Sequence, residues 1–161
     1  MSSYRDDREW SDRFIPAIRR VVGPLLLEPA PLEMDCSEAT DLIVMRARDI
    51  RIAARVRRPG YLKSYADQFT IRSRRDNGMT TELRKMIEGW GDWMLYGHAN
   101  DSETDLATWM VIDLHAWRAA MIRRRNGSPA TGEKPNGDGT WFRWYDVNTF
   151  PSDPPILVAR G

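Results

Sequence analysis

Apolar residues near the start of the chain recur with the spacing of a helix. Five of them follow one another at intervals of four, four, three and four positions, which places them on one helical face: Trp10, Phe14, Ile18, Val21 and Leu25. Pro16 lies inside this stripe and has no backbone N–H, so we expect the helix either to begin late or to kink there. The prolines and acids of residues 27–40 then indicate a connector.

Strand patterns follow this connector. Residues 41–45 (DLIVM) form a short apolar run that begins with Asp41, and residues 49–58 alternate between apolar side chains and arginines. Together they predict a hairpin that turns at residues 46–48. Residues 68–74 alternate again, with Phe69 and Ile71 on one side and arginines on the other. If the two arginine-bearing strands are neighbours, their polar faces form one continuous basic surface.

The remaining pattern completes an α+β protein. A helix capped by Thr80 or Thr81, two strands, a helix capped by Asp113 and a strand over residues 140–147 are expected, with an edge strand near residues 156–159. Residues 126–139 are rich in Gly and Pro and predict a mobile loop. We expect a single domain over residues 1–161, an α/β (α+β) fold with a central mixed sheet flanked by helices.

Composition narrows the class of protein. The 161 residues are 42% hydrophobic, and no window approaches the length of a membrane span, so no membrane partner is expected. The N-terminal residues are charged where an export signal is apolar, which predicts a cytoplasmic location. The chain contains one cysteine, Cys36, and two histidines. Neither an internal disulfide nor a structural zinc site of the usual Cys/His spacing is therefore expected.

The charge is strongly uneven along the chain. Residues 46–85 contain twelve Lys/Arg and four acids, a segment charge of +8 in a chain whose formal net charge is only +1. Such a segment predicts contact with DNA or RNA, although an acidic protein partner or a merely solvated face has the same signature. Seven arginines are the predicted nucleic-acid contacts, since their planar forks suit phosphate: Arg51, Arg55, Arg57, Arg58, Arg72, Arg74 and Arg75.

Candidate catalytic chemistry is acidic. Phosphodiester hydrolysis generally needs a divalent metal on carboxylates and a cation near the scissile phosphate. Asp41 and Glu82 are the candidate ligands for Mg²⁺ or Mn²⁺, with Lys85 or Arg55 as the cation. The alternatives are structural: Asp41 begins a strand, and Glu82 is favoured by the dipole of its helix.

Structural roles are also open for seven other residues. Asp113 is expected as a helix cap rather than a ligand, and His98 and His115 lack a partner at catalytic spacing. Four tryptophans suit core packing, with base stacking as the alternative for the last two: Trp90, Trp93, Trp141 and Trp144.

The order helix, strand hairpin, third strand, helix, fourth strand over about residues 8–98 resembles the core of the PD-(D/E)XK nuclease superfamily, written αβββαβ. Asp41 matches its first acid, but Ala53, Ala54 and Arg55 stand where an acid, any residue and a lysine are expected. The resemblance therefore implies a nuclease whose second acid and lysine have moved to Glu82 and Lys85. Residues 67–99 also resemble phage and prophage proteins.

These observations support two functional hypotheses of different classes. The first is a nucleic-acid-binding protein with a nuclease-like core, with Mg²⁺-dependent hydrolysis at a degenerate or migrated site. The second is a non-enzymatic phage protein that binds and inhibits a host protein through its basic face. A structural virion component is a third. The edge strand near residues 156–159 leaves room for a homodimer.

Overall fold

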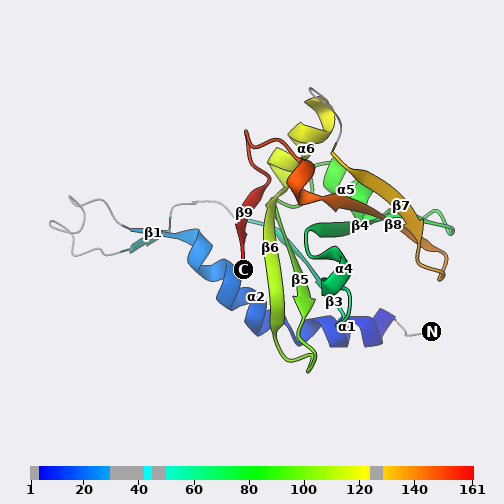
Figure 1. The fold of residues 1–161 in the computed structure, drawn as a ribbon, viewed down its shortest axis with the longest axis horizontal. Coiled ribbons are helices and arrows are strands. Elements are labelled where there is room, and N and C mark those ends of the chain that lie inside the picture. Colours follow the sequence, from blue (N-terminus) through cyan, green and yellow to red (C-terminus); the bar gives the residue numbers. More distant parts are fainter. Residues whose placement is uncertain (1–3, 30–41, 45–49, 124–128) are drawn as a thin grey trace. The chain divides into compact units, whose positions relative to one another are not determined.

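The structure is a computed structural model that describes residues 4–29, 42–44, 50–123 and 129–161. The chain divides into two compact units, residues 1–50 and residues 51–161. The larger unit has an α+β fold (Figure 1). Within the described ranges, none of the helices is long and apolar enough to cross a membrane.

The smaller unit begins with two short helices, α1 (Tyr4–Asp12) and α2 (Ile15–Val22). The predicted stripe is thus interrupted just before Pro16, which lies in the first turn of α2, where a missing N–H removes no helical hydrogen bond. A 3-10 helix (Gly23–Leu26) leads to β1 (Leu27–Pro29), which pairs antiparallel with β2 (Leu42–Val44). The predicted hairpin is therefore wrong, because β2 pairs with β1, a strand at the start of the predicted connector.

The larger unit contains two sheets instead of the single central sheet that we expected. The four-stranded sheet has the order β3 (Ile52–Arg57), β5 (Trp93–Ala99), β6 (Leu106–Asp113), β9 (Leu157–Arg160), and it is mixed because β3 runs parallel to β5. The three-stranded sheet is antiparallel, with the order β4 (Gln68–Arg75), β8 (Thr140–Asp146), β7 (Thr131–Pro135). The two arginine-bearing strands, β3 and β4, thus belong to different sheets, and the nuclease-like αβββαβ order is not formed as one sheet.

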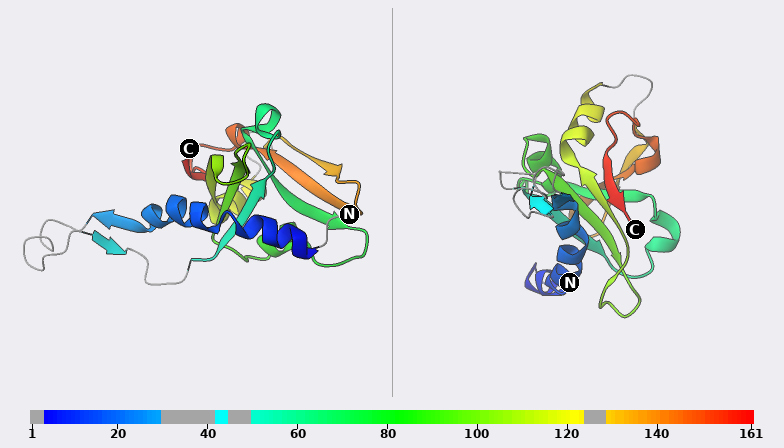
Figure 2. Two further views of the ribbon diagram at one scale, coloured as in Figure 1. Left: turned by 90° about the horizontal axis from the view of Figure 1, so that it is seen from below. Right: turned by 90° about the vertical axis from the view of Figure 1, so that its left-hand side faces the viewer.

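Part of the predicted mobile loop is a strand. Residues 131–135 form β7, which pairs with β8 and is visible beside it in the left view of Figure 2. As the edge strand of its sheet, β7 needs few apolar side chains, which explains why its composition resembles that of a loop. Gly137 and Gly139 have positive φ angles in the turn to β8. Residues 124–128 lie outside the described ranges.

Three helices join these strands: α4 (Leu62–Tyr65), α5 (Glu82–Ile87) and α6 (Leu114–Arg123). The Thr81 hydroxyl caps α5 by accepting a hydrogen bond from the Arg84 backbone N–H at 3.3 Å, as the sequence predicts. The Asp113 carboxylate caps α6 by accepting from the backbone N–H groups of His115 and Ala116 at 2.7 and 2.9 Å. Asp113 therefore acts as the helix cap that the sequence indicates.

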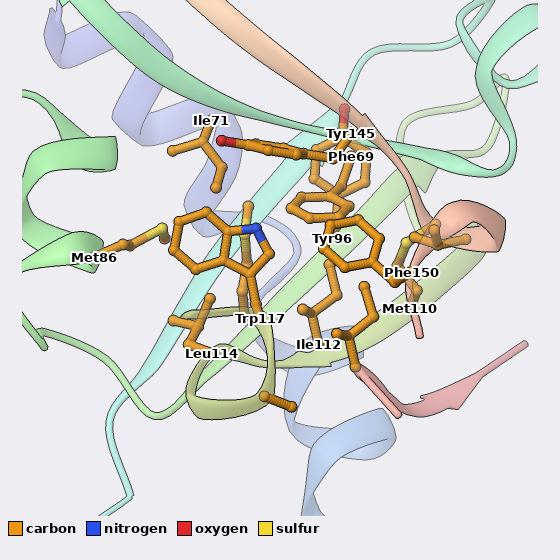
Figure 3. Packing of buried hydrophobic residues seen from close by; sticks show 14 of the residues in the cluster. Phe69, Ile71, Met86, Tyr96, Met110, Ile112, Leu114, Trp117, Tyr145 and Phe150 are labelled. Atoms are coloured by element: carbon orange, nitrogen blue, oxygen red, sulfur yellow. The ribbon is translucent and has the colours of Figure 1, made fainter. Parts of the chain in front are cut away.

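The core packs both sheets against α6 (Figure 3). Phe69 of β4 stacks on Tyr145 of β8 with 5.1 Å between ring centroids, and Trp117 of α6 meets Tyr145 edge-on at 5.7 Å. Met94 and Ile112 supply the apolar surface of the four-stranded sheet. Burial of this apolar surface is the main stabilising contribution to the larger unit.

Strand β4 contacts the four-stranded sheet with both of its faces. Phe69 and Ile71 enter the core, whereas Thr70 points the other way and its hydroxyl lies 3.2 Å from the Tyr96 hydroxyl of β5. The three-stranded sheet therefore meets the four-stranded sheet along one of its edges. A corner between the two sheets remains on the side of Thr70, opposite the core.

Candidate nucleic-acid interface

The arginine face of β3 is turned toward the other sheet and not toward solvent. Ala53 packs against the core, and the Arg55 side chain is only 17% exposed. Arg55 donates through Nη1 to the Thr70 carbonyl at 3.1 Å and to Glu82 Oε2 at 2.9 Å. The predicted continuous solvent-facing row is therefore wrong, because the chain uses this face to join the two sheets.

Glu82 has a structural partner on each side. The same Oε2 that pairs with Arg55 also accepts from the backbone N–H of Arg72 at 3.1 Å, while Lys85 is exposed on the surface of α5. Among the described residues, no group of three His, Cys, Asp or Glu side chains could hold a metal ion. Asp41 lies outside those residues. The predicted Asp41–Glu82 site for Mg²⁺ or Mn²⁺ therefore stays a prediction, with one oxygen of Glu82 already engaged by Arg55 and Arg72.

Arg55, Arg72 and Arg75 form what we call the arginine cluster. Burial lowers the pKa of the Arg72 guanidinium, and the positive charges of Arg55 and Arg75 lower it further. Within the described ranges, the buried Nε atoms of Arg72 and Arg75 have no hydrogen-bond partner. An unpartnered buried donor costs free energy, so this cluster lowers the stability of the fold.

The other predicted arginines are separated from this cluster. Arg51 pairs with Asp92 at 3.4 Å, and Arg58 pairs with Glu103 at 3.7 Å. Arg74 lies over the Trp141 ring, 3.9 Å from its centroid. A bulge in β4 between Arg72 and Arg74 shifts the register, so Arg74 pairs with Trp141 while Arg72 pairs with the next residue of β8, Phe142. Arg72 and Arg74 therefore lie on opposite faces, against expectation.

The face of the three-stranded sheet that carries Arg72 alternates cations with aromatic rings. One row across the sheet consists of Arg72, Phe142 and Lys134, which are direct cross-strand neighbours. The next row consists of Thr70, Trp144 and Gly132. A Cβ atom on Gly132 would lie 2.8 Å from Trp144 Nε1, so the indole lies closely over the glycine backbone.

A pocket of about 180 Å³ lies between this face and the four-stranded sheet. We call it the aromatic pocket, because five of its ten lining residues are aromatic. It is lined by Arg57, Tyr61, Tyr65, Gln68, Thr70, Tyr96, His98, Lys134, Phe142 and Trp144. Arg57 is the only one of them that the sequence predicts as a nucleic-acid contact, and its guanidinium lies over Tyr61, 4.5 Å from the ring centroid.

Polar groups of the pocket are concentrated on its inner wall. His98 is 2% exposed, its Nδ1 lies 3.3 Å from the Thr108 hydroxyl, and burial together with the charge of Arg57 lowers its pKa. The ring is therefore neutral at pH 7. The hydroxyls of Thr70 and Tyr96 share one hydrogen bond, and the Gln68 side chain has no partner among the described residues. These groups can both donate and accept hydrogen bonds.

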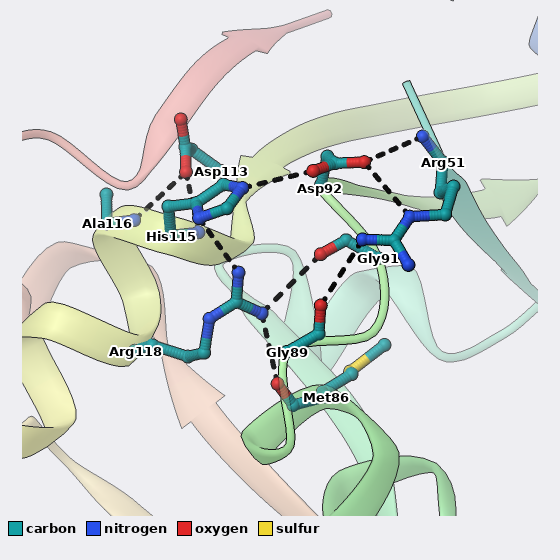
Figure 4. A network of polar contacts seen from close by, with 9 residues as sticks. All are labelled: Arg51, Met86, Gly89, Gly91, Asp92, Asp113, His115, Ala116 and Arg118. Carbon is teal, nitrogen blue, oxygen red and sulfur yellow. Dashed lines mark hydrogen bonds and ion pairs between the residues drawn. The ribbon is translucent and has the colours of Figure 1, made fainter. Parts of the chain in front are cut away.

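A second polar network, shown in Figure 4, joins α6 to the loop before β5. Asp92 is 6% exposed and accepts from the Arg51 backbone N–H at 2.9 Å, while His115 Nε2 lies 3.1 Å from its other oxygen. Arg118 donates to His115 Nδ1 at 3.1 Å, and because arginine cannot accept, the imidazole proton must be on Nε2. Both ring nitrogens are engaged, so this aspartate–histidine pair is structural.

The tryptophans divide between core and surface. Trp93 is buried, whereas Trp90 is 60% exposed beneath the guanidinium of Arg51. Trp144 lines the aromatic pocket.

The pocket's members come from separate elements, and apart from Arg57 and Trp144 no signal in the sequence singles them out. The chain matches no protein-family model, curated protein or solved structure.

Proposed function

We propose that this protein binds nucleic acid on the face of the three-stranded sheet that carries the arginine cluster. The single observation that supports this most directly is the row of Arg72, Phe142 and Lys134, a cation on each side of an aromatic ring on one antiparallel sheet. Guanidinium and ammonium groups bind phosphates, and aromatic rings stack on bases regardless of sequence. The surface therefore suits strand binding with little sequence preference.

Two further features support the proposal. The arginine cluster lies beside the row, since Arg72 belongs to both, and guanidinium groups suit phosphate oxygens. Glu82 neutralises only part of the positive charge of the arginine cluster. Its carboxylate forms an ion pair with Arg55 at 2.9 Å. The cluster thus retains a positive field at the edge of the aromatic pocket.

The test measures the affinity of single-stranded and duplex DNA and RNA by fluorescence anisotropy at several salt concentrations. Arg72→Gln is compared with Arg143→Gln, which removes the same charge from the opposite face of the same sheet, where Arg143 pairs with Glu133 at 4.0 Å. We expect Arg72→Gln to weaken binding about tenfold and to reduce the slope of log K against log salt by about 0.7–0.9. Equal effects of both variants, or no binding at low salt, would overturn the proposal.

The same incubations are run with Mg²⁺ or EDTA, and cleavage is scored beside binding. Cleavage lost in both Asp41→Asn and Glu82→Gln would support the migrated nuclease site that the sequence suggests. A stable complex with a host protein that survives nuclease treatment, together with no affinity for nucleic acid, would favour the inhibitor hypothesis.

A further inference from the structure

We infer that the aromatic pocket takes one unstacked nucleobase, with the adjoining phosphate on Arg57 and Lys134. This inference rests on the proposed function and adds a ligand to it, namely a base that is unpaired or extruded from its strand. The chemistry of a nucleobase next to a phosphate is shared by a nucleic-acid strand and by a free nucleotide, and the experiment below separates these two sources.

The shape of the pocket suits one planar ring system. Its volume of about 180 Å³ admits a single base but not a stacked base pair. Trp144 and Phe142 line it from the three-stranded sheet, and Tyr61 and Tyr65 line it from the segment of α4. A base that leaves its stack loses stacking energy, and aromatic walls of this kind replace it.

The polar wall suits the hydrogen-bonding edge of a base. The Gln68 amide offers a donor and an acceptor side by side, which is the pattern that pairs with a base edge. The Thr70 and Tyr96 hydroxyls share a single hydrogen bond at 3.2 Å, so one of the two hydroxyl hydrogens is left for a ligand. An apolar ligand would leave these groups without partners, which disfavours a lipid or a hydrocarbon.

The cations of the pocket are placed for an anion beside the ring. Arg57 is held over Tyr61 at 4.5 Å by a cation–π contact, which orders its guanidinium before any ligand binds. Lys134 of β7 lines the same pocket and is exposed without an ion pair among the described residues. His98 also lines the pocket, and because burial and the charge of Arg57 lower its pKa, it does not add to the positive charge that a neutral base would meet.

The experiment uses a DNA hairpin with one bulged nucleotide, either 2-aminopurine or an abasic residue. We expect the chain to bind the 2-aminopurine hairpin about tenfold more tightly than the abasic one, and to quench its fluorescence by stacking. Tyr61→Ala and Gln68→Ala should each remove this preference for the 2-aminopurine hairpin over the abasic one. Trp109→Leu, on a half-buried ring outside the pocket, serves as the control beside Trp144→Leu.

The outcomes separate the two proposals. Equal affinity for the two hairpins without quenching would overturn the pocket inference, while loss of binding in Arg72→Gln would still support the proposed function. No binding of either hairpin would count against both. Displacement of 2-aminopurine by a free nucleoside monophosphate at micromolar concentration would identify the free nucleotide as the ligand, whereas displacement only at millimolar concentration would identify the strand.

Discussion

Arg55 Nη1 and Glu82 Oε2 lie 2.9 Å apart, and this ion pair joins β3 of the four-stranded sheet to the first turn of α5. Arg55 also donates to the Thr70 carbonyl of β4. The pair thus connects three elements at the point where the two sheets meet. Because both side chains are partly removed from water, removal of either partner leaves the other charge poorly solvated.

Glu82→Gln should therefore destabilise the fold by about 1–3 kcal/mol in urea unfolding. The control is Glu88→Gln, which breaks the exposed Arg84–Glu88 pair at 2.8 Å and should change stability far less, because water already solvates both charges. Removal of the carboxylate also leaves the arginine cluster more positive, so Glu82→Gln should bind DNA or RNA more tightly. Weaker binding by this variant would contradict our assignment of Glu82 as the partner of the cluster.

Asp92 should make stability depend on acid pH. The hydrogen bond from the Arg51 backbone N–H, followed by that from His115, lowers the pKa of Asp92 from 3.8 to about 2. A lowered carboxyl pKa contributes stability above the unfolded value, and this contribution is lost as pH falls from about 4 toward 2. Asp92→Asn should cost on the order of 1–2 kcal/mol at pH 7, with a smaller cost at pH 3. A cost that is constant between these two pH values would contradict this role.

His98 should make the free energy of unfolding depend on pH in a higher pH range than Asp92 does. Burial, and then the charge of Arg57, lowers its pKa below 6.5, so the unfolded chain takes up a proton at a pH where the folded chain does not. Stability from this residue is therefore complete above about pH 6.5 and falls as the pH decreases below that value. When the pH is lowered from 7 to 5.5, we expect His98→Asn to lose less unfolding free energy than the unsubstituted chain loses. An unchanged loss would show that other groups cause the dependence.

Gly132→Ala tests the packing of Trp144. The added Cβ would lie 2.8 Å from Nε1 and 3.0 Å from Cε2, so the indole must move. We expect a loss of about 1–3 kcal/mol in stability together with weaker quenching of the bulged 2-aminopurine. Gly23→Ala is the control, because Gly23 has φ −50° and no atom within 4 Å of the added carbon. A shift in quenching without a shift in stability would show a ring that repacks freely.

The sequence predicted most helices and strands of the larger unit but not how the strands pair. Alternation located β3 and β4, since each strand presents two different faces. It could not show that the arginine face of β3 points inward, because that depends on Glu82, which is 27 residues beyond Arg55 and in another element. The bulge at Ser73 likewise reversed the face of Arg74, and a one-residue shift of this kind leaves no trace in a hydrophobic pattern.

The candidate site was even less accessible from sequence. Arg57 was predicted from charge, and base stacking was the alternative to core packing for Trp144, but their proximity arises from the meeting of two sheets. His115 was expected to lack a catalytic partner, and its contact with Asp92 spans 23 positions and two elements. Contacts of this separation depend on topology, which local pattern does not specify.

β3 also occupies an edge of the four-stranded sheet, where among the described strands it pairs only with β5. An open edge can recruit the same strand of another molecule and so begin aggregation. Arginines at positions 51, 55, 57 and 58 repeat along this edge, and two such edges brought together would repel each other. The residues that prepare one side of β3 for a polyanion thus also help to keep copies of the chain apart.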